Sequence, residues 1–260
     1  MKKVIVTGSS GTVGSALCGY LESEDVEVIA WDRSLIPIDD YWAMETFMKR
    51  EQPDALFHLA IASQPQGQND SWRVNYRWPS ELAWLTRQLN VSFVFTSTVM
   101  VFEQSVAGPY TPMMTPVATD GYGYEKRMAE ERVLYQNPDT VIARLGWQIG
   151  DAAGSNNMID FLVTRQEREG EIRASKRWKP ACSFLQDTVA ALTDLVGVTP
   201  GTYHVDSNPK WNFYEIATAL NEKHGNLWNI VPTEDFVYDQ RMIDPRVEMP
   251  PLSYRLPSLN

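Results

Sequence analysis

The chain has 260 residues, with 23 Lys plus Arg against 33 Asp plus Glu and a formal net charge of −10. Apolar residues make up 43% of the sequence and aromatic residues 11%, which excludes an intrinsically disordered chain and indicates a globular core. The acidic balance argues against a nucleic-acid-binding protein, which carries a basic stripe, and no apolar run approaches the roughly 20 residues of a membrane helix.

Short apolar runs alternate with longer amphipathic stretches up to about residue 150. The runs predict strands, because residues buried on both faces of a parallel sheet are apolar almost throughout. They are Lys3–Val6, Val26–Trp31, Ala55–Leu59, Val91–Thr96 and Val141–Leu145. Helices are expected between them at Thr12–Glu22, Tyr41–Glu51, Ser71–Leu89 and Tyr122–Gln136, with a kink or irregular start at Pro79. The alternation predicts an α/β fold with a parallel sheet.

After residue 150 this pattern loosens. Helices are expected at Asn157–Glu169, Asp187–Val196 and Asn212–Lys223, and a strand at Gly201–Val205. The proline-rich stretch from Pro232 onward predicts ordered loop with short elements. We therefore expect a dinucleotide-binding domain over residues 1–150, to which 182–207 return, and a small substrate-binding lobe made of 151–181 and 208–260.

The first strand is followed at once by Thr7-Gly8-Ser9-Ser10-Gly11-Thr12-Val13-Gly14 and a helix. Gly8 would permit a tight turn, Gly11 a close approach of backbone to a pyrophosphate, and Gly14 close packing of helix on strand. A helix N-terminus offers N–H groups and a positive dipole end to an anion. The turn predicts a dinucleotide site in a Rossmann-type, doubly wound sheet.

The second strand ends at Trp31-Asp32-Arg33. Asp32 is placed to accept hydrogen bonds from the ribose hydroxyls of an adenosine, and its charge would repel a 2′-phosphate. Arg33 would instead pair with a 2′-phosphate. NAD is therefore slightly favoured and NADP stays open.

A hydroxyl residue and a tyrosine–lysine pair follow the fourth strand. Thr98 comes at its end, and Tyr122 and Lys126 are four residues apart, so that they share one face of a helix. A nearby ammonium stabilises a phenolate and brings the tyrosine pKa from about 10 toward neutral pH. The three residues are typical of proton transfer to or from a carbonyl or alcohol oxygen.

The T-G-x-x-G-x-x-G turn, Thr98 and the Y-x-x-x-K spacing together resemble the extended short-chain dehydrogenase/reductase superfamily. The resemblance implies that Tyr122 is the general acid–base, that Lys126 also holds the nicotinamide ribose, and that Thr98 orients the substrate oxygen. It further implies a dinucleotide site made of Thr7, Gly8, Ser10, Gly11, Thr12, Val13, Gly14, Asp32, Arg33, Asp39, Leu59, Ala60, Ala62, Thr96, Ser97, Tyr122 and Lys126.

Within that superfamily the chain resembles the dTDP-4-dehydrorhamnose reductase group, at Phe93–Phe102, Gly108-Pro109-Tyr110 and Phe57-His58-Leu59-Ala60. Reductases of that group usually place Asp after the hydroxyl residue, where this chain has Val99 and then Met100. Their acidic Asp-Gln element is replaced by a basic stretch with Lys176, Arg177 and Trp178. We expect these five residues to contact substrate. For the basic stretch, an equal alternative to substrate contact is that it forms a solvated loop.

The sequence thus predicts an NAD(P)-dependent reductase acting on a keto or hydroxyl group of a sugar nucleotide or related carbohydrate. Alternatives are an NAD-dependent epimerase and a non-enzymatic dinucleotide-binding regulatory subunit. Cys18 and Cys182 fit no metal or redox spacing and are typical of reduced thiols in the cytoplasm. No His spacing suggests a metal site. A homodimer through the helices at Ser71–Leu89 and Tyr122–Gln136 is a further expectation.

Overall fold

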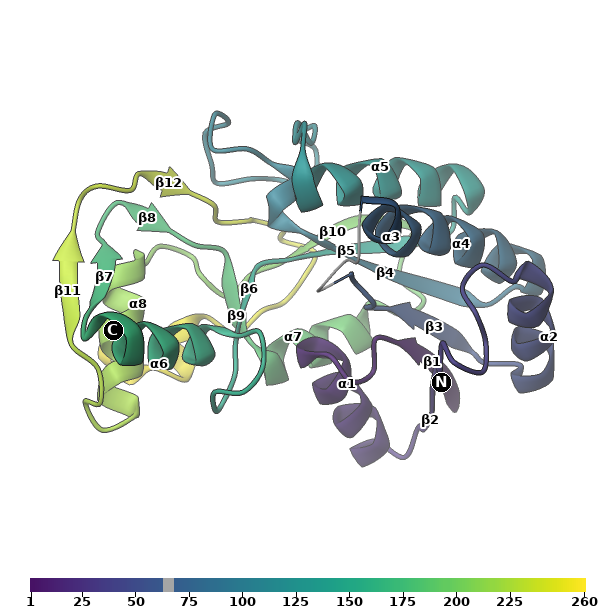
Figure 1. Ribbon diagram of the computed structural model, residues 1–260, viewed down its shortest axis with the longest axis horizontal. Coiled ribbons are helices and arrows are strands. Elements are labelled where there is room, and N and C mark those ends of the chain that lie inside the picture. Colours follow the sequence, from purple (N-terminus) through teal and green to yellow (C-terminus); the bar gives the residue numbers. More distant parts are fainter. Residues whose placement is uncertain (63–67) are drawn as a thin grey trace. The chain divides into compact units, whose positions relative to one another are not determined.

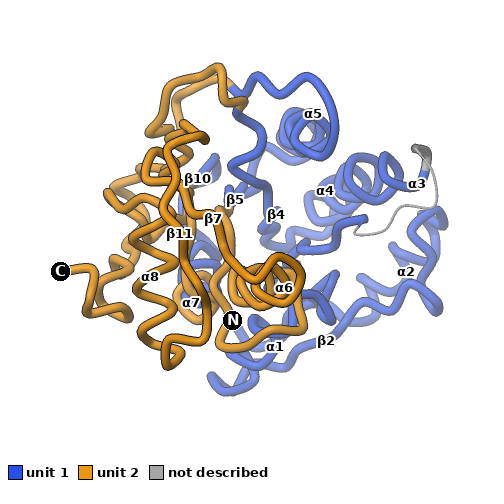
Figure 2. The backbone as a smooth tube through the Cα atoms, turned by 60° about the vertical axis from the view of Figure 1, so that its left-hand side comes forward, with its two compact units in different colours: residues 1–102, 116–144, 189–203 blue, residues 103–115, 145–188, 204–260 orange. Residues whose placement is uncertain are grey.

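The structure is a computed structural model that describes residues 1–62 and 68–260. Its internal contacts divide the chain into two compact units, drawn in blue and orange in Figure 2. The first unit comprises residues 1–102, 116–144 and 189–203, and the second comprises 103–115, 145–188 and 204–260. The domain boundaries expected from the sequence remain a prediction, and the structure groups residues 103–115 with the second unit.

A parallel sheet forms the centre of the first unit. Its six strands lie in the order β2-β1-β3-β4-β5-β10, and β1 pairs in parallel with both β2 and β3. The chain therefore adds strands on one side of β1 and then on the other, which creates a switch point between β1 and β3 where such sheets bind ligands. The strands are β1 Lys3–Thr7, β2 Glu27–Ala30, β3 Ala55–His58, β4 Ser92–Thr98, β5 Val141–Leu145 and β10 Gly201–Val205. The predicted α/β fold is confirmed.

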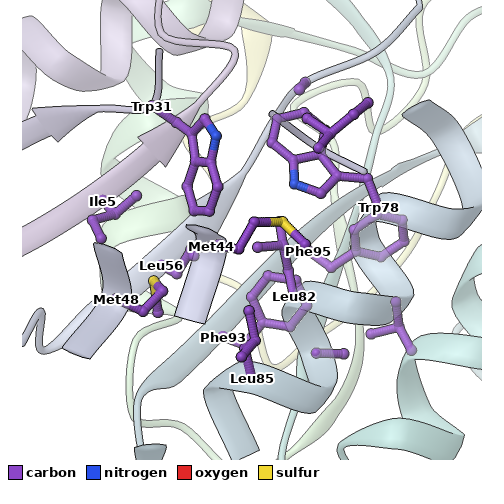
Figure 3. Packing of buried hydrophobic residues seen from close by; sticks show 14 of the residues in the cluster. Ile5, Trp31, Met44, Met48, Leu56, Trp78, Leu82, Leu85, Phe93 and Phe95 are labelled. Carbon is purple, nitrogen blue, oxygen red and sulfur yellow. The ribbon is translucent and has the colours of Figure 1, made fainter. Parts of the chain in front are cut away.

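Helices cover both faces of this sheet (Figure 1). On one face, α2 (Tyr41–Glu51), α4 (Trp78–Leu89) and α5 (Gly121–Gln136) pack against the strands. Figure 3 shows Met44 and Leu82 from two of these helices among strand residues such as Phe93. The other face carries α1 (Thr12–Ser23) and α7 (Leu185–Asp194).

The helix expected at Ser71–Leu89 is divided into three segments. It begins as α3 (Gln68–Trp72), continues as the π-helical segment η1 (Arg73–Arg77) and becomes α4 at Trp78. Pro79 lies in the first turn of α4, and because α4 continues directly from the π-helical segment, its missing N–H interrupts the helical hydrogen-bonding pattern there. The irregularity expected at Pro79 thus lies just before it, and single π turns of this kind are frequent at functional sites.

The second unit is built from short parallel pairs: β6 with β9, β7 with β11 and β8 with β12. Its own core packs between these strands and two helices, and the chain then ends in two 3-10 turns. The bounds are β6 Trp147–Ile149, α6 Met158–Glu169, β7 Ile172–Ser175, β8 Trp178–Lys179, β9 Cys182–Phe184, α8 Phe213–Lys223, β11 Ile230–Thr233, β12 Tyr238–Asp239, η3 Leu252–Tyr254 and η4 Pro257–Leu259.

Candidate active site

The glycine-rich turn connects β1 to α1 at the switch point of the sheet. Gly8 has φ +70, and a Cβ there would lie 2.7 Å from the amide nitrogen of Ala60. A Cβ on Gly14 would lie 2.0 Å from the carbonyl oxygen of Gly8. Both positions therefore accept only glycine without displacement of backbone. The amide of Gly11 donates to the Gly8 carbonyl at 2.9 Å, which closes the turn.

The N-terminus of α1 faces no capping side chain. Gly11 is the N-cap residue, it contributes no side chain, and the first turn contains no acidic residue. Ser10 is exposed, and Thr12 and Val13 are half-buried. The partial positive charge of the helix end is thus available to an anion, as a pyrophosphate cradle requires.

Hydrogen bonds join the ends of three strands beneath this turn. Thr7 Oγ1 and His58 Nδ1 are 2.9 Å apart, and Thr96 Oγ1 donates to the carbonyl of His58 at 2.9 Å. The amide of Ala60 donates to Thr7 Oγ1 at 3.3 Å. Burial, and then the charge of Lys126, lower the pKa of His58 well below its ordinary value, so its imidazole is neutral. The hydroxyl groups of Thr7 and Thr96 therefore hold the backbone at His58 and Ala60, where β3 ends next to the glycine-rich turn.

Lys126 is the buried cation of this region, only 1% exposed. Its Nζ donates to the carbonyl oxygen of Thr96 at 2.8 Å and stands 4.3 Å from the centre of the Phe95 ring. Burial lowers the pKa of Lys126 to about 7, against the opposing effects of Glu130 and Glu125. The ammonium thus changes its charge near neutral pH.

Tyr122 lies in the first turn of α5, four residues before Lys126. The sequence-based expectation that the Lys126 ammonium lowers the pKa of Tyr122 is wrong here: burial, and then the charge of Glu125, raise that pKa above its ordinary value. Gly123 lets this turn approach the 3-10 segment η2 (Val99–Val101), since a Cβ there would lie 2.1 Å from the Met100 carbonyl oxygen. The approach brings the start of α5 to the end of β4, where Thr98 lies.

Two hydroxyl residues occupy the end of β4. Thr98 is 9% exposed and its Oγ1 accepts from the amide of Met100 at 3.2 Å. The Oγ of Ser97 is buried without a hydrogen-bond partner. An unpaired buried hydroxyl has an unmet need for a partner, which a bound ligand can supply. Val99 is buried and Met100 is half exposed.

The carboxylate of Glu125 ties α5 to the α3–η1 segment. Its Oε2 accepts from Ser71 Oγ at 2.6 Å and from Asn75 Nδ2 at 2.7 Å. Asn75 Oδ1 in turn accepts from the amide of Ala62 at 3.1 Å. Sequence reasoning assigned no role to Glu125 or Asn75. The available signal was an acidic residue inside the Y-x-x-x-K spacing.

The acidic residue after β2 is already oriented. Asp32 is exposed, and its Oδ1 accepts from the amide and the hydroxyl of Ser34 at 2.8 and 2.6 Å. These hydrogen bonds lower the pKa of Asp32 and keep it ionised. Arg33 is exposed, and Asp39 forms an ion pair with Arg73 at 3.3 Å. Leu59 and Ala62, the other predicted dinucleotide contacts, are half-buried after β3.

The predicted substrate residues of the basic stretch lie in the second unit. The Trp178 indole packs on Phe213 with ring centroids 4.8 Å apart, and its Nε1 donates to Gln240 at 2.6 Å. Lys176 stands over the Tyr214 ring at 5.3 Å, and Arg177 is exposed. Trp178 is therefore part of the aromatic packing of this unit, with its edge held by a hydrogen bond. Contact of these three side chains with substrate remains a prediction.

Within residues 1–62 and 68–260, no group of three or more His, Cys, Asp or Glu side chains is arranged to hold a metal ion. None of the helices there has both the length and the apolarity that crossing a membrane requires.

Comparison with known proteins gives a family match. The family model described as RmlD substrate binding domain matches residues 1–241. The chain is 28% identical over 229 residues to the spore coat polysaccharide biosynthesis protein SpsK of Bacillus subtilis, covering 86% of this chain and 80% of that protein. It is 28% identical over 243 residues to a dTDP-4-dehydrorhamnose reductase of Streptomyces griseus, covering 89% and 74%.

Solved structures with the same fold include a dTDP-4-dehydrorhamnose reductase from Bacillus anthracis in complex with NADP. That structure has a TM-score of 0.85 at 19% identity and covers 99% of this chain and 98% of its own. The enzyme WbmH of Bordetella bronchiseptica in complex with NAD+ has a TM-score of 0.78 at 19% identity, with 99% and 97% covered.

Proposed function

The chain belongs to the RmlD substrate binding domain family, and we propose that it is an NAD(P)-dependent reductase of nucleotide-linked sugars. The family membership confirms the resemblance to the dTDP-4-dehydrorhamnose reductase group. The observation that carries the proposal is the placement of Thr98, Tyr122 and Lys126. All three belong to the first unit, at the end of β4 and the start of α5, in the same unit as the glycine turn.

A nicotinamide dinucleotide fits the residues of the first unit. Gly8 and Gly14 leave backbone where any Cβ would intrude, and the uncapped N-terminus of α1 suits a pyrophosphate. Asp32 would hold the adenosine ribose, the turn after β3 would line the adenine side, and Lys126 would hold the nicotinamide ribose. When bound, the dinucleotide supplies the hydride of the reaction.

Each residue of the catalytic set has a distinct task. The raised pKa of Tyr122 keeps the phenol protonated at neutral pH, so it is a proton donor to a keto oxygen. Thr98 Oγ1 would orient that oxygen. Lys126, with a pKa of about 7, offers an ammonium that stabilises the phenolate left after proton transfer. A protonated phenol favours the direction from ketone to alcohol.

NAD is the proposed preferred cofactor, because the ionised Asp32 would repel a 2′-phosphate. The adjacent, exposed Arg33 is the feature that would admit NADP. A lower Kd for NADPH than for NADH would overturn this preference.

We also propose that the protein is a cytoplasmic homodimer. The two free cysteines, Cys18 and Cys182, are typical of a reducing compartment. The helices α4 and α5 carry the large exposed side chains Trp84 and Tyr135, which suit a surface between two copies. Light scattering checks the dimer, and a monomeric mass at micromolar concentration would exclude it.

A thermal-shift screen of nucleotide-linked keto sugars, with NADH or NADPH present, tests the substrate class, because a ligand that binds only the folded state raises the Tm. We expect a dTDP-linked 4-keto sugar to raise the Tm and to be reduced with consumption of NAD(P)H. Interconversion of two sugar nucleotides without net consumption, by protein that retains NAD through purification, would identify an epimerase instead.

A further inference from the structure

Glu125 occupies a position inside the catalytic spacing, three residues after Tyr122 and one before Lys126. Its carboxylate accepts hydrogen bonds from Ser71 Oγ and Asn75 Nδ2 at 2.6 and 2.7 Å. These short hydrogen bonds to a charged acceptor are of the strong kind. The active-site helix is therefore attached to the α3–η1 segment by the residue next to its catalytic lysine.

Asn75 extends this attachment to the predicted dinucleotide site. It is 1% exposed and lies in the π-helical segment, and its Oδ1 accepts from the amide of Ala62 at 3.1 Å. One amide side chain thus contacts both the Glu125 carboxylate and the backbone of the turn after β3. The Trp72 and Tyr124 rings stack 6.3 Å apart between the same two elements, so the packing there does not depend on the carboxylate alone.

We propose that Glu125 is a positioning residue that, through its hydrogen bonds to Ser71 and Asn75, holds Tyr122 and Lys126 in place relative to the dinucleotide-facing turn and places a negative charge beside the lysine. This inference rests on the proposed function. Glu125 connects two elements: its hydrogen bonds reach Ser71 and Asn75 in the α3–η1 segment, and its backbone belongs to the first turns of α5, which carry Tyr122 and Lys126.

The charge of Glu125 acts on both members of the catalytic pair, because it raises the pKa of Tyr122 and of Lys126. The hydrogen bonds that hold its carboxylate come from neutral side chains. Among the described residues, the ionisable groups that interact electrostatically with Lys126 are His58 from β3 and Glu125 and Glu130 from α5 itself, while β4 offers the Thr96 carbonyl and the Phe95 ring. Of the two carboxylates, Glu130 is already paired with Arg144 of β5.

The pH dependence of dinucleotide binding reports this charge. Lys126 is charged below its pKa of about 7 and loses the charge as the pH rises. Dinucleotide affinity is therefore expected to fall as the pH rises through the midpoint of Lys126. Removal of the negative charge at Glu125 moves that midpoint to lower pH, because the ammonium then loses a stabilising neighbour.

The test measures the Kd of NADH and NADPH by fluorescence across a pH series, for the wild type, Glu125→Gln, Glu125→Ala and Glu131→Gln. Glutamine keeps an acceptor for Ser71 and Asn75 but removes the charge, whereas alanine removes both. Glu131 is an exposed acidic residue on the same helix and provides the matched control. Circular dichroism and the Tm of each variant establish that it folds.

We expect Glu125→Gln to bind as tightly as the wild type at acid pH, with its midpoint shifted to lower pH. Glu125→Ala is expected to bind about tenfold more weakly even at acid pH, since it also loses two hydrogen bonds to a charged group. Coincident midpoints for Glu125→Gln, Glu131→Gln and the wild type, or wild-type affinity in folded Glu125→Ala, would overturn the proposal. Wild-type protein that binds dinucleotide but turns over no sugar nucleotide would overturn the proposed function alone, and wild-type protein that binds no dinucleotide would overturn both.

Discussion

Lys126 and Thr96 are joined by a hydrogen bond of 2.8 Å from the ammonium to a main-chain carbonyl at the end of β4. The same threonine donates its hydroxyl to the carbonyl of His58 on the neighbouring strand. Lys126 is thus held at the carboxyl ends of two parallel strands, at the edge where such sheets bind ligands. A buried ammonium opposes folding, so its presence here supports the proposed functional role of Lys126 rather than a stabilising one.

Substitution Lys126→Met is expected to separate these two effects. The methionine fills a similar volume and removes the buried charge, so the Tm should stay equal or rise. Turnover should fall by a factor of about 10² to 10⁴, as for loss of an acid–base group. Calorimetry and a steady-state assay measure the two quantities. A large fall in Tm together with retained turnover would show that Lys126 has a structural role only.

The same lysine gives a pH-dependent stability term. Its pKa is about 7 in the folded chain against an ordinary value of 10.5, so the unfolded chain binds more protons between these values. The unfavourable contribution of Lys126 is therefore complete below pH 7 and disappears as the pH rises through that window. We expect the stability advantage of Lys126→Met in urea unfolding to shrink from neutral to alkaline pH. An advantage that grows with pH would contradict the assignment.

Two glycines of α1 form a matched pair for testing the turn. A Cβ on Gly14 would lie 2.0 Å from the Gly8 carbonyl oxygen, whereas Gly19 has nothing within 4 Å. Gly14→Ala should abolish dinucleotide binding and lower stability. Gly19→Ala should leave binding unchanged and gain up to about 1 kcal/mol, the helix propensity difference between the two residues. Equal effects of the two substitutions in isothermal titration and urea unfolding would refute the role of the turn.

Arg144 and Glu130 form a buried ion pair, with Nη2 and Oε2 2.7 Å apart and side chains only 4% and 6% exposed. Arg144→Met leaves a buried carboxylate without its cation and should destabilise the protein by about 3–5 kcal/mol. The double variant Arg144→Met, Glu130→Leu should recover most of that loss. Urea unfolding of the single and double variants gives both values. A double variant less stable than Arg144→Met would exclude this account.

Asp32 provides the test of cofactor preference. Asp32→Ala should raise the Kd of NADH more than that of NADPH, since only the carboxylate discriminates against the 2′-phosphate. Arg33→Ala should have the opposite effect. Fluorescence titration of each variant with NADH and with NADPH measures these Kd values. If Asp32→Ala weakened NADPH binding more than NADH binding, the proposed preference for NAD would be reversed.

Local patterns in the sequence were enough to predict the parallel sheet and the glycine turn. They also predicted that Thr98 ends a strand and that Tyr122 and Lys126 lie on one helix. Each depends on a short segment, such as an apolar strand or a Y-x-x-x-K spacing, whose physical meaning is independent of the rest of the chain. The π-helical segment at Arg73–Arg77 was placed only approximately, because Pro79 indicates an irregularity but not its kind.

The hydrogen bonds and packing contacts between elements distant in sequence could not be predicted. Glu125 and Ser71 are separated by 54 positions, and their contact depends on how α5 packs on the α3–η1 segment. The short strands of the second unit, such as β8 at Trp178–Lys179, have too few residues to show the alternation of apolar and polar side chains by which a strand is recognised. The sequence predicts substrate contact for Trp178, whose ring packs on Phe213 in the core of the second unit.

The central claim, that Tyr122 protonates a keto oxygen in a nicotinamide-dependent reduction, is tested most directly by one comparison. The wild type and Tyr122→Phe are each given NAD(P)H and a dTDP-linked 4-keto sugar, and absorbance of the reduced cofactor is followed while its Kd is measured separately. The account predicts consumption by the wild type, a loss of turnover of about 10² to 10⁴ in Tyr122→Phe, and nearly equal Kd values. Turnover by Tyr122→Phe at the wild-type rate would contradict it.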